Sequence, residues 1–115
     1  LTTKPLIAGT NTTIGVVATD AQISKTQARR LAVLAHDGLA RSINPVHTVS
    51  DGDTLFALGT GQSGKTLGMM TLGALAAEVT ARATVNAVLA ASSLRIGTLW
   101  LPGLADQAAS DQATS

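Results

Sequence analysis

The chain has 115 residues, and its eight Lys and Arg against seven Asp and Glu give a formal net charge of +1. This balance, with no basic runs carrying interleaved aromatics, favours neither nucleic acid nor an anionic membrane as a partner. The chain has no cysteine, which excludes a disulfide framework, a thiolate nucleophile and a cysteine metal site. Its length allows one domain or part of a larger one, and we expect further sequence upstream of Leu1.

Apolar residues make up 45% of the chain, but they are mostly small, with one Phe, one Trp and no Tyr. Because apolar burial contributes roughly 25 cal/mol per Å², a core of such residues is modest. We therefore expect a partner surface to cover part of the chain. Glu78, Arg82 and Asn86 interrupt the longest apolar segment, so no run reaches the roughly 18 residues of a membrane-spanning helix. We expect a cytoplasmic protein.

The first half of the chain predicts an irregular start, a strand and a helix. Residues 1–11 contain Pro and Gly and predict irregular structure. Residues 12–21, TTIGVVATDA, are β-branched and apolar and predict a strand. Because this strand is apolar on both faces, we expect it to be buried within a sheet. Ser24 and Gln27 form a capping-box pattern, which predicts a helix to about Ser42. The apolar face of this helix would carry Ala28, Leu31, Ala32, Ala35 and Leu39.

The second half predicts a turn at Asp51–Asp53, a strand over Thr54–Leu58, a Gly-rich loop and a second long helix over Thr66–Ser92. We expect an extended tail from Leu94 onward, with disorder over residues 106–115. The order β-α-β-α suits one half of a layered α/β sandwich better than a complete domain.

The sequence GTGQSGKT, Gly59–Thr66, fits the phosphate-loop template G-x-x-x-x-G-K-[ST]. In that interpretation backbone N–H groups cradle a phosphate, Lys65 reaches the terminal phosphates, and Thr66 holds Mg²⁺ at a helix N-terminus. However, no second apolar strand ending in Asp follows, as nucleotide hydrolysis requires. Gly, Ser and Gln are also ordinary loop residues. A nucleotide-binding module using Gly59–Thr66 remains an alternative hypothesis.

Another candidate for chemistry is Thr12, in the sequence Asn11-Thr12-Thr13. A Thr hydroxyl becomes a useful nucleophile when a base lies beside it, and a Thr that begins a chain can use its own α-amino group. On residue chemistry alone, however, Thr is common at strand starts. Asp-Gly, as in Asp51–Asp53, is likewise ordinary turn chemistry.

Four segments in order carry a family resemblance: GTNTTIGVVATDA from Gly9, HDGLAR from His36, PVHT from Pro45 and DGDTLFAL from Asp51. Together they resemble the self-cleaving N-terminal-nucleophile amidohydrolases. That family includes the L-aminopeptidase/D-esterase, the β-peptidyl aminopeptidases, the nylon-oligomer hydrolase and the pantetheine hydrolase of carbapenem synthesis. The likeness continues more loosely through LGALAAEVTARATVNAVL. The Asn-Thr junction is similar to the Thr branch, which includes the nylon-oligomer hydrolase.

Members of that family are made as one precursor that cuts itself, and the smaller C-terminal chain begins with the nucleophile. The resemblance implies that Asn11–Thr12 is the scissile bond, Thr12 the nucleophile, and Asp51 and Asp53 its supporting carboxylates. Residues 1–11 would then be the end of the α chain or a pre-cleavage linker, and residues 12–105 the β-chain part of the hydrolase domain. The implied fold is α/β, part of a four-layer α-β-β-α sandwich that a separate α chain completes.

The resemblance also implies partners and substrates. The α chain supplies the oxyanion-hole Asn, αβ units assemble into tetramers or larger species, and neither a cofactor nor a metal is needed. Substrates would be small peptides or linear amides, with 6-aminohexanoate oligomers among the candidates. Because an N-terminal Thr needs no His base, His36 and His47 are interpreted as structural. A non-catalytic assembly subunit is a further alternative, against which the intact Thr12, Asp51 and Asp53 argue.

Overall fold

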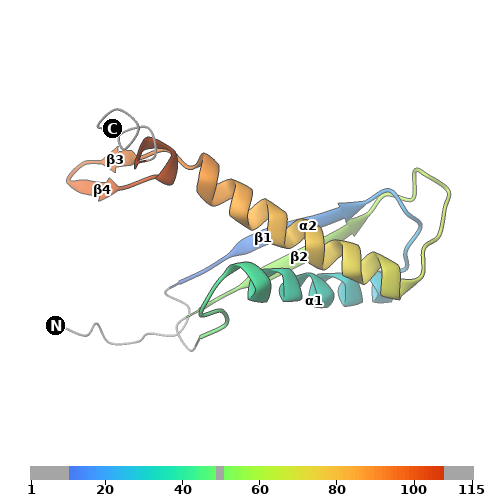
Figure 1. The fold of residues 1–115 in the computed structure, drawn as a ribbon. Helices are drawn as coiled ribbons and strands as arrows, with labels where there is room; N and C mark the ends of the chain where they lie inside the picture. Colours follow the sequence, from blue (N-terminus) through green and yellow to red (C-terminus); the bar gives the residue numbers. More distant parts are fainter. Residues whose placement is uncertain (1–10, 49–50, 108–115) are drawn as a thin grey trace. The chain divides into compact units, whose positions relative to one another are not determined.

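The computed structural model describes residues 11–48 and 51–107. Along the chain lie β1 (Ile14–Thr19), α1 (Lys25–Ser42), β2 (Thr54–Gly59), α2 (Met69–Ala90), β3 (Leu94–Ile96) and β4 (Leu99–Leu101), drawn in Figure 1. The chain is therefore mixed α/β, as the sequence predicts. It divides into two compact units, residues 1–81 and 82–115, with the boundary inside α2.

In the first unit, β1 and β2 form a parallel pair that α1 connects. Each residue of β1 pairs with the residue forty positions later, from Ile14 with Thr54 to Thr19 with Gly59. The same offset extends to an isolated bridge between Asn11 and Asp51, ahead of both strands. Because parallel strands begin at the same edge of a sheet, the segments preceding β1 and β2 lie beside each other.

The predicted capping box at the start of α1 is confirmed. Gln27 N–H donates to Ser24 Oγ at 3.1 Å, and Ser24 N–H donates to Gln27 Oε1 at 2.9 Å. These two bonds satisfy backbone donors that the first helical turn leaves without partners. At the other end, the Ser42 hydroxyl donates to Gly38 O at 2.8 Å, and the helix ends there as predicted.

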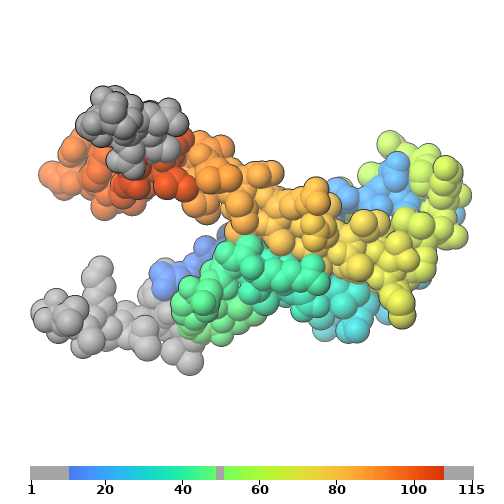
Figure 2. Space-filling model, in the orientation of Figure 1, coloured from blue at the N-terminus to red at the C-terminus, as the bar shows by residue number. Residues whose placement is uncertain are grey.

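The core of the first unit lies between one face of the sheet and the helices. Its central residues are Val17, Leu31, Ala35, Leu72 and Ala76, with partly buried apolar side chains from β2 packed against them. The predicted apolar face of α1 is confirmed, since its inner residues are buried or half-buried. Figure 2 shows α1 in green and the first turns of α2 in yellow side by side.

The outer face of the sheet is exposed, which corrects the prediction of a strand buried on both faces. Ile14 is 71% and Val16 64% exposed on β1, and Phe56 and Leu58 on β2 also exceed half. Alternate residues of a strand face opposite sides, so Gly15 and Val17 point inward while these apolar residues point out. A strand with apolar residues on both sides is typical of a sheet covered on both faces. Among the described residues, only one face has its cover.

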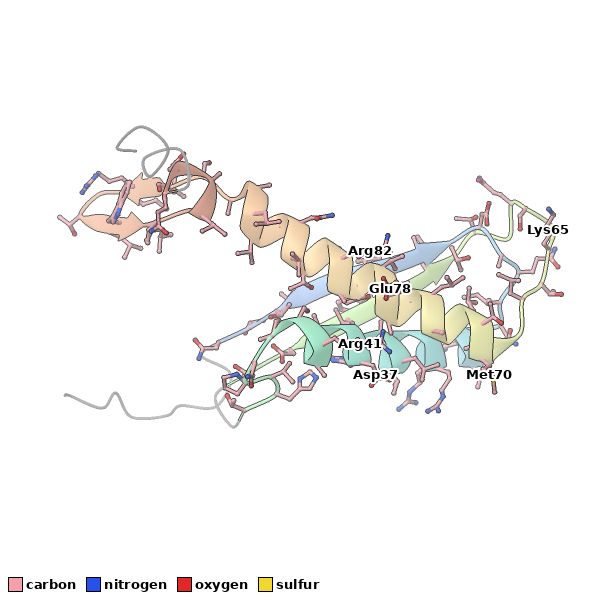
Figure 3. All side chains as sticks on the ribbon, in the orientation of Figure 1. Asp37, Arg41, Lys65, Met70, Glu78 and Arg82 are labelled. Atoms are coloured by element: carbon pink, nitrogen blue, oxygen red, sulfur yellow. The ribbon has the colours of Figure 1, made fainter. Side chains whose placement is uncertain are left out.

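Gly38 lies buried where α1 meets α2, and it has a steric reason to be glycine. A Cβ there would lie 2.7 Å from Thr80 Cβ and 2.9 Å from Ala81 N, the latter a backbone atom of the facing helix. Arg41 and Glu78, labelled in Figure 3, form an ion pair at 3.8 Å between the same helices.

Replacing Gly38 by Ala is therefore expected to lower the free energy of unfolding by about 2 kcal/mol, a typical cost of overpacking. The sign is informative, because Ala stabilises an ordinary helix interior by about 1 kcal/mol over Gly. Urea denaturation measures the change. Gly68→Ala is the control, since a Cβ at Gly68 meets nothing within 4 Å. A Gly38→Ala variant as stable as the parent would contradict the close approach.

In the second unit, the sequence predicts an extended tail from Leu94. The structure corrects this prediction, because β3 and β4 form an antiparallel hairpin. Leu94 pairs with Leu101, and the turn between the strands contains Gly97 with a φ of 59°. The Arg95 guanidinium lies 5.1 Å from the Trp100 ring centroid, a cation–π contact across the hairpin.

A helical turn over 104–107 follows this hairpin, which corrects the predicted disorder at residues 106 and 107. The other residues of that predicted tail, 108–115, lie outside the described residues. Within the turn, a backbone and a side-chain hydrogen bond from Ser93 hold the pKa of Asp106 below its usual range. The carboxylate accepts Ser93 N–H at 2.6 Å. Because the folded pKa is lowered, this contact stabilises the fold at neutral pH and is lost as the pH falls through the lowered value.

Candidate active site

The pairing ahead of β1 and β2 brings the predicted site residues together. The Asn11 carbonyl oxygen accepts the Gly52 N–H, and the Thr13 carbonyl oxygen accepts the Thr54 N–H at 2.9 Å. The residues on either side of Thr12 are thus held by backbone bonds to the turn at Asp51–Asp53. Thr12 itself is exposed, opposite Gly52 in the register.

Asp53 is the carboxylate that faces this junction. Its Oδ1 accepts the Thr13 N–H at 3.1 Å, and its Oδ2 lies 2.7 Å from His47 Nδ1. Its side chain is only 6% exposed. A buried carboxylate must be hydrogen-bonded to be tolerated, and here both oxygens have partners. One of those partners is the residue that follows Thr12 along the chain.

Asp51 has a different environment from Asp53. Its Oδ2 accepts the Thr48 N–H at 2.7 Å, and its own N–H donates to the Thr48 carbonyl at 3.0 Å. These two bonds hold Asp51 against Thr48 ahead of β2. The structure therefore places both predicted carboxylates beside the Asn11–Thr12 junction. Of the two, Asp53 bonds directly to Thr13, the residue after Thr12.

His47 is the residue of this cluster that sequence reasoning missed as a carboxylate partner. Its φ of 54° lies in the left-handed region, uncommon for a residue with a side chain. Its ring centroid lies 4.9 Å from that of His36 on α1. The sequence signal for this contact was the short spacing between PVHT, which contains His47, and DGD, which contains Asp53. However, a spacing of six residues in a loop does not fix which side chains meet.

The phosphate-loop residues lie at the opposite end of the sheet. The loop follows the C-terminal ends of β1 and β2, whereas Thr12 precedes their N-terminal ends, and Figure 3 shows Lys65 in that distant loop. Gln22 N–H donates to Lys65 O at 2.8 Å, and the Ser63 hydroxyl donates to Asp20 O at 2.9 Å. These bonds tie the loop to the segment after β1.

The helix that the sequence predicts to begin at Thr66 begins at Met69, which is a correction. Lys65 and Thr66 therefore lie in the segment before the helix, whereas a phosphate loop needs them at its first turn. Within residues 11–48 and 51–107, no group of three or more His, Asp and Glu side chains could hold a metal ion. No helix in that part of the chain is long and apolar enough to cross a membrane.

A groove of about 330 Å³ lies on the helical side of the first unit, lined by side chains of α1 and α2. None of Thr12, His47, Asp51 and Asp53 lines it. The cluster at the head of the sheet is thus separate from this groove.

Comparison with known proteins supplies the family. A model described as Peptidase family S58 matches residues 2–98. The chain belongs to this peptidase family. The match extends over both segments that form the cluster, since it includes residues 11–13 and 51–53. The family resemblance carried by the four sequence segments is thereby confirmed.

Several known proteins are similar in sequence to this chain. An uncharacterized aminopeptidase of Mycobacterium leprae is 47% identical over 104 residues, which cover 79% of this chain and 29% of that protein. An uncharacterized aminopeptidase of Mycobacterium tuberculosis is 48% identical over 92 residues, 69% of this chain and 27% of the relative. A 6-aminohexanoate-oligomer endohydrolase of Kocuria is 35% identical over 86 residues, 65% of this chain and 24% of the relative. The chain thus spans less than a third of the length of these relatives.

Proposed function

We propose that this chain is the nucleophile-bearing part of a self-processing amide hydrolase, in which Thr12 becomes N-terminal and attacks amide bonds. The observation that carries the proposal is the pairing of Asn11–Thr13 with Asp51–Asp53. This pairing attaches the buried carboxylate of Asp53 to the residue after Thr12. Similarity to proteins named aminopeptidase and 6-aminohexanoate-oligomer endohydrolase supports amide hydrolysis as the reaction.

Self-cleavage would begin with attack of Thr12 Oγ on the Asn11 carbonyl carbon. The Oγ proton passes to a base as a tetrahedral intermediate forms, and the C–N bond then breaks while the departing Thr12 nitrogen takes a proton. The resulting ester joins Asn11 to Thr12 Oγ, and water hydrolyses it to an Asn11 carboxylate and a free Thr12. The Gly52 N–H already donates to the Asn11 carbonyl oxygen, so it would polarise the bond under attack.

Turnover would use the same atoms on a substrate. The freed α-amino group of Thr12 takes the Oγ proton, Oγ attacks the substrate carbonyl, and the amine product leaves with a proton. Water then hydrolyses the acyl-enzyme to release the acid and restore the hydroxyl. The Asp53 carboxylate, fixed one residue away, would stabilise the ammonium that forms on Thr12 during this cycle. Asp51 would support the turn that presents Asp53.

The exposed outer face of the sheet supports a two-chain enzyme. Ile14, Val16, Phe56 and Leu58 form an apolar surface on the side of the sheet that the helices leave uncovered. We infer that a sheet of the α chain packs on it, which would complete the four-layer α-β-β-α sandwich. The α chain would also supply the oxyanion-hole Asn and pocket walls, and αβ units would assemble further. Small peptides or linear amides, including 6-aminohexanoate oligomers, are the proposed substrates.

Mass spectrometry of the purified full-length protein tests this proposal. We expect two polypeptides, the smaller of which begins at Thr12 by N-terminal sequencing. A single intact chain, or a cut at any other bond, would show the assignment of the junction to be wrong. A panel of aminoacyl p-nitroanilides and 6-aminohexanoate oligomers then tests turnover, with the uncut protein as the inactive reference.

A further inference from the structure

We propose that His47 is a positioning residue for the Thr12 reaction, because it holds the Asp53 carboxylate in place. This inference rests on the proposed function. It starts from the two hydrogen-bonding directions of one carboxylate, since Oδ1 meets Thr13 N–H at 3.1 Å and Oδ2 lies 2.7 Å from His47 Nδ1. Through Asp53, His47 is thereby connected to Thr13, the residue after the proposed nucleophile.

The short His47–Asp53 contact defines where a proton lies. Two atoms 2.7 Å apart must share a hydrogen, and an ionised carboxylate carries none, so His47 Nδ1–H donates to Asp53 Oδ2. Hydrogen bonds to an ionised partner are about twice as strong as neutral ones. With Oδ2 bonded to His47, the other oxygen, Oδ1, points toward the Thr13 N–H. A carboxylate held on both oxygens keeps one orientation beside Thr12.

The backbone at His47 indicates that this orientation is imposed. A side-chain-bearing residue in the left-handed region costs free energy and persists when its surroundings require it. At His47 the φ is 54°, and the ring sits between the His36 ring and the Asp53 carboxylate. Asp51 is the other carboxylate of this loop, and it bonds Thr48, the next residue.

Two substitutions separate this role from simple packing. Both His47→Gly and His47→Asn suit a positive φ, but only Asn keeps an N–H donor near the position of Nδ1. In the full-length precursor, we expect His47→Gly to slow cleavage at Asn11–Thr12 by ten- to a hundredfold, a typical cost of lost positioning. His47→Asn should recover most of that rate.

The measurement is the first-order rate of precursor cleavage at neutral pH, followed by mass spectrometry, with thermal unfolding as a check on folding. His36→Asn is the matched control, since His36 contacts the His47 ring but has no bond to Asp53 among the described contacts. Its rate should stay within about threefold of the parent. If His47→Gly does not fold, His47→Ala, which also lacks a side-chain donor, replaces it in the comparison with His47→Asn.

The inference is overturned if the parent is cut normally and both His47 variants match its rate. It is equally overturned if Gly and Asn slow cleavage alike, because the donor would then be irrelevant. A parent that is never cut at Asn11–Thr12 instead contradicts the proposed function itself, and His47 then has no reaction to serve. The two failures are thus distinguishable.

Discussion

Replacing Thr12 by alanine is expected to leave the full-length precursor uncut, with a cleavage rate more than about a thousandfold below the parent, as for other enzymes that lose their nucleophile. The physical reason is that no other group can form the ester with Asn11 when the Oγ is gone. Intact mass spectrometry of protein held at neutral pH measures the result. The Asn11 carbonyl would remain bonded to the Gly52 N–H, so no loss of folding is expected.

The adjacent threonine provides the matched control for this prediction. Thr13 bonds Asp53 and Thr54 through its backbone N–H and carbonyl, so Thr13→Ala removes a hydroxyl without removing either bond. It should be cut at close to the parental rate, and Thr12→Ser, which keeps a hydroxyl, should also be cut. If Thr13→Ala blocks cleavage and Thr12→Ala does not, the nucleophile is the second threonine.

Replacing Asp53 by asparagine is expected to slow cleavage by about a hundredfold or more, the usual range for a lost acid–base or charge-stabilising group. Asparagine keeps an oxygen for the Thr13 N–H but has no negative charge. Its NH₂ group would also face His47 Nδ1, which is a donor in the parent. The variant thus separates the charge of residue 53 from its shape. Time courses of precursor cleavage give the rate, and chemical denaturation gives the accompanying change in stability.

Two further carboxylates sharpen this second prediction. Asp20→Asn, at the far end of β1, is the control and should leave the rate unchanged, because Asp20 lies at the other end of the sheet. Asp51→Asn should slow cleavage less than Asp53→Asn, because the Asp51 carboxylate bonds the Thr48 N–H and not the Thr13 N–H. A larger effect at Asp51 would mean that the wrong carboxylate has been assigned to the junction.

Local signals in the sequence predicted the elements that position this cluster. The capping box at Ser24 and the apolar spacing of α1 depend on neighbours within a few residues, so they were visible without the fold. The two strands were predicted from β-branched and apolar runs, and β1 and β2 lie at these positions. The approach of Asp51 and Asp53 to Thr12 came from the family resemblance, since no local pattern fixes a parallel register.

The errors share a different cause, which is that they depend on contacts between distant segments. The helix start at Met69 is set by a loop tied to Asp20 and Gln22, which the sequence of the loop does not reveal. The His47–Asp53 contact requires an unusual backbone angle at His47, and no propensity predicts it. Burial of Ile14 was predicted from an apolar pattern that suits a sheet covered on both faces, whereas the described residues cover one face.

The two backbone bonds of Thr13 determine what remains in place once the proposed cut is made. Cleavage frees Asn11 and its carbonyl, but the Thr13 N–H still bonds Asp53 and its carbonyl still bonds Thr54. The newly created amino terminus would therefore have a single untethered residue. Its amine and hydroxyl could move only by rotation about the few bonds of Thr12. The cut chain would therefore lose little conformational entropy when Thr12 adopts the conformation that attacks a substrate.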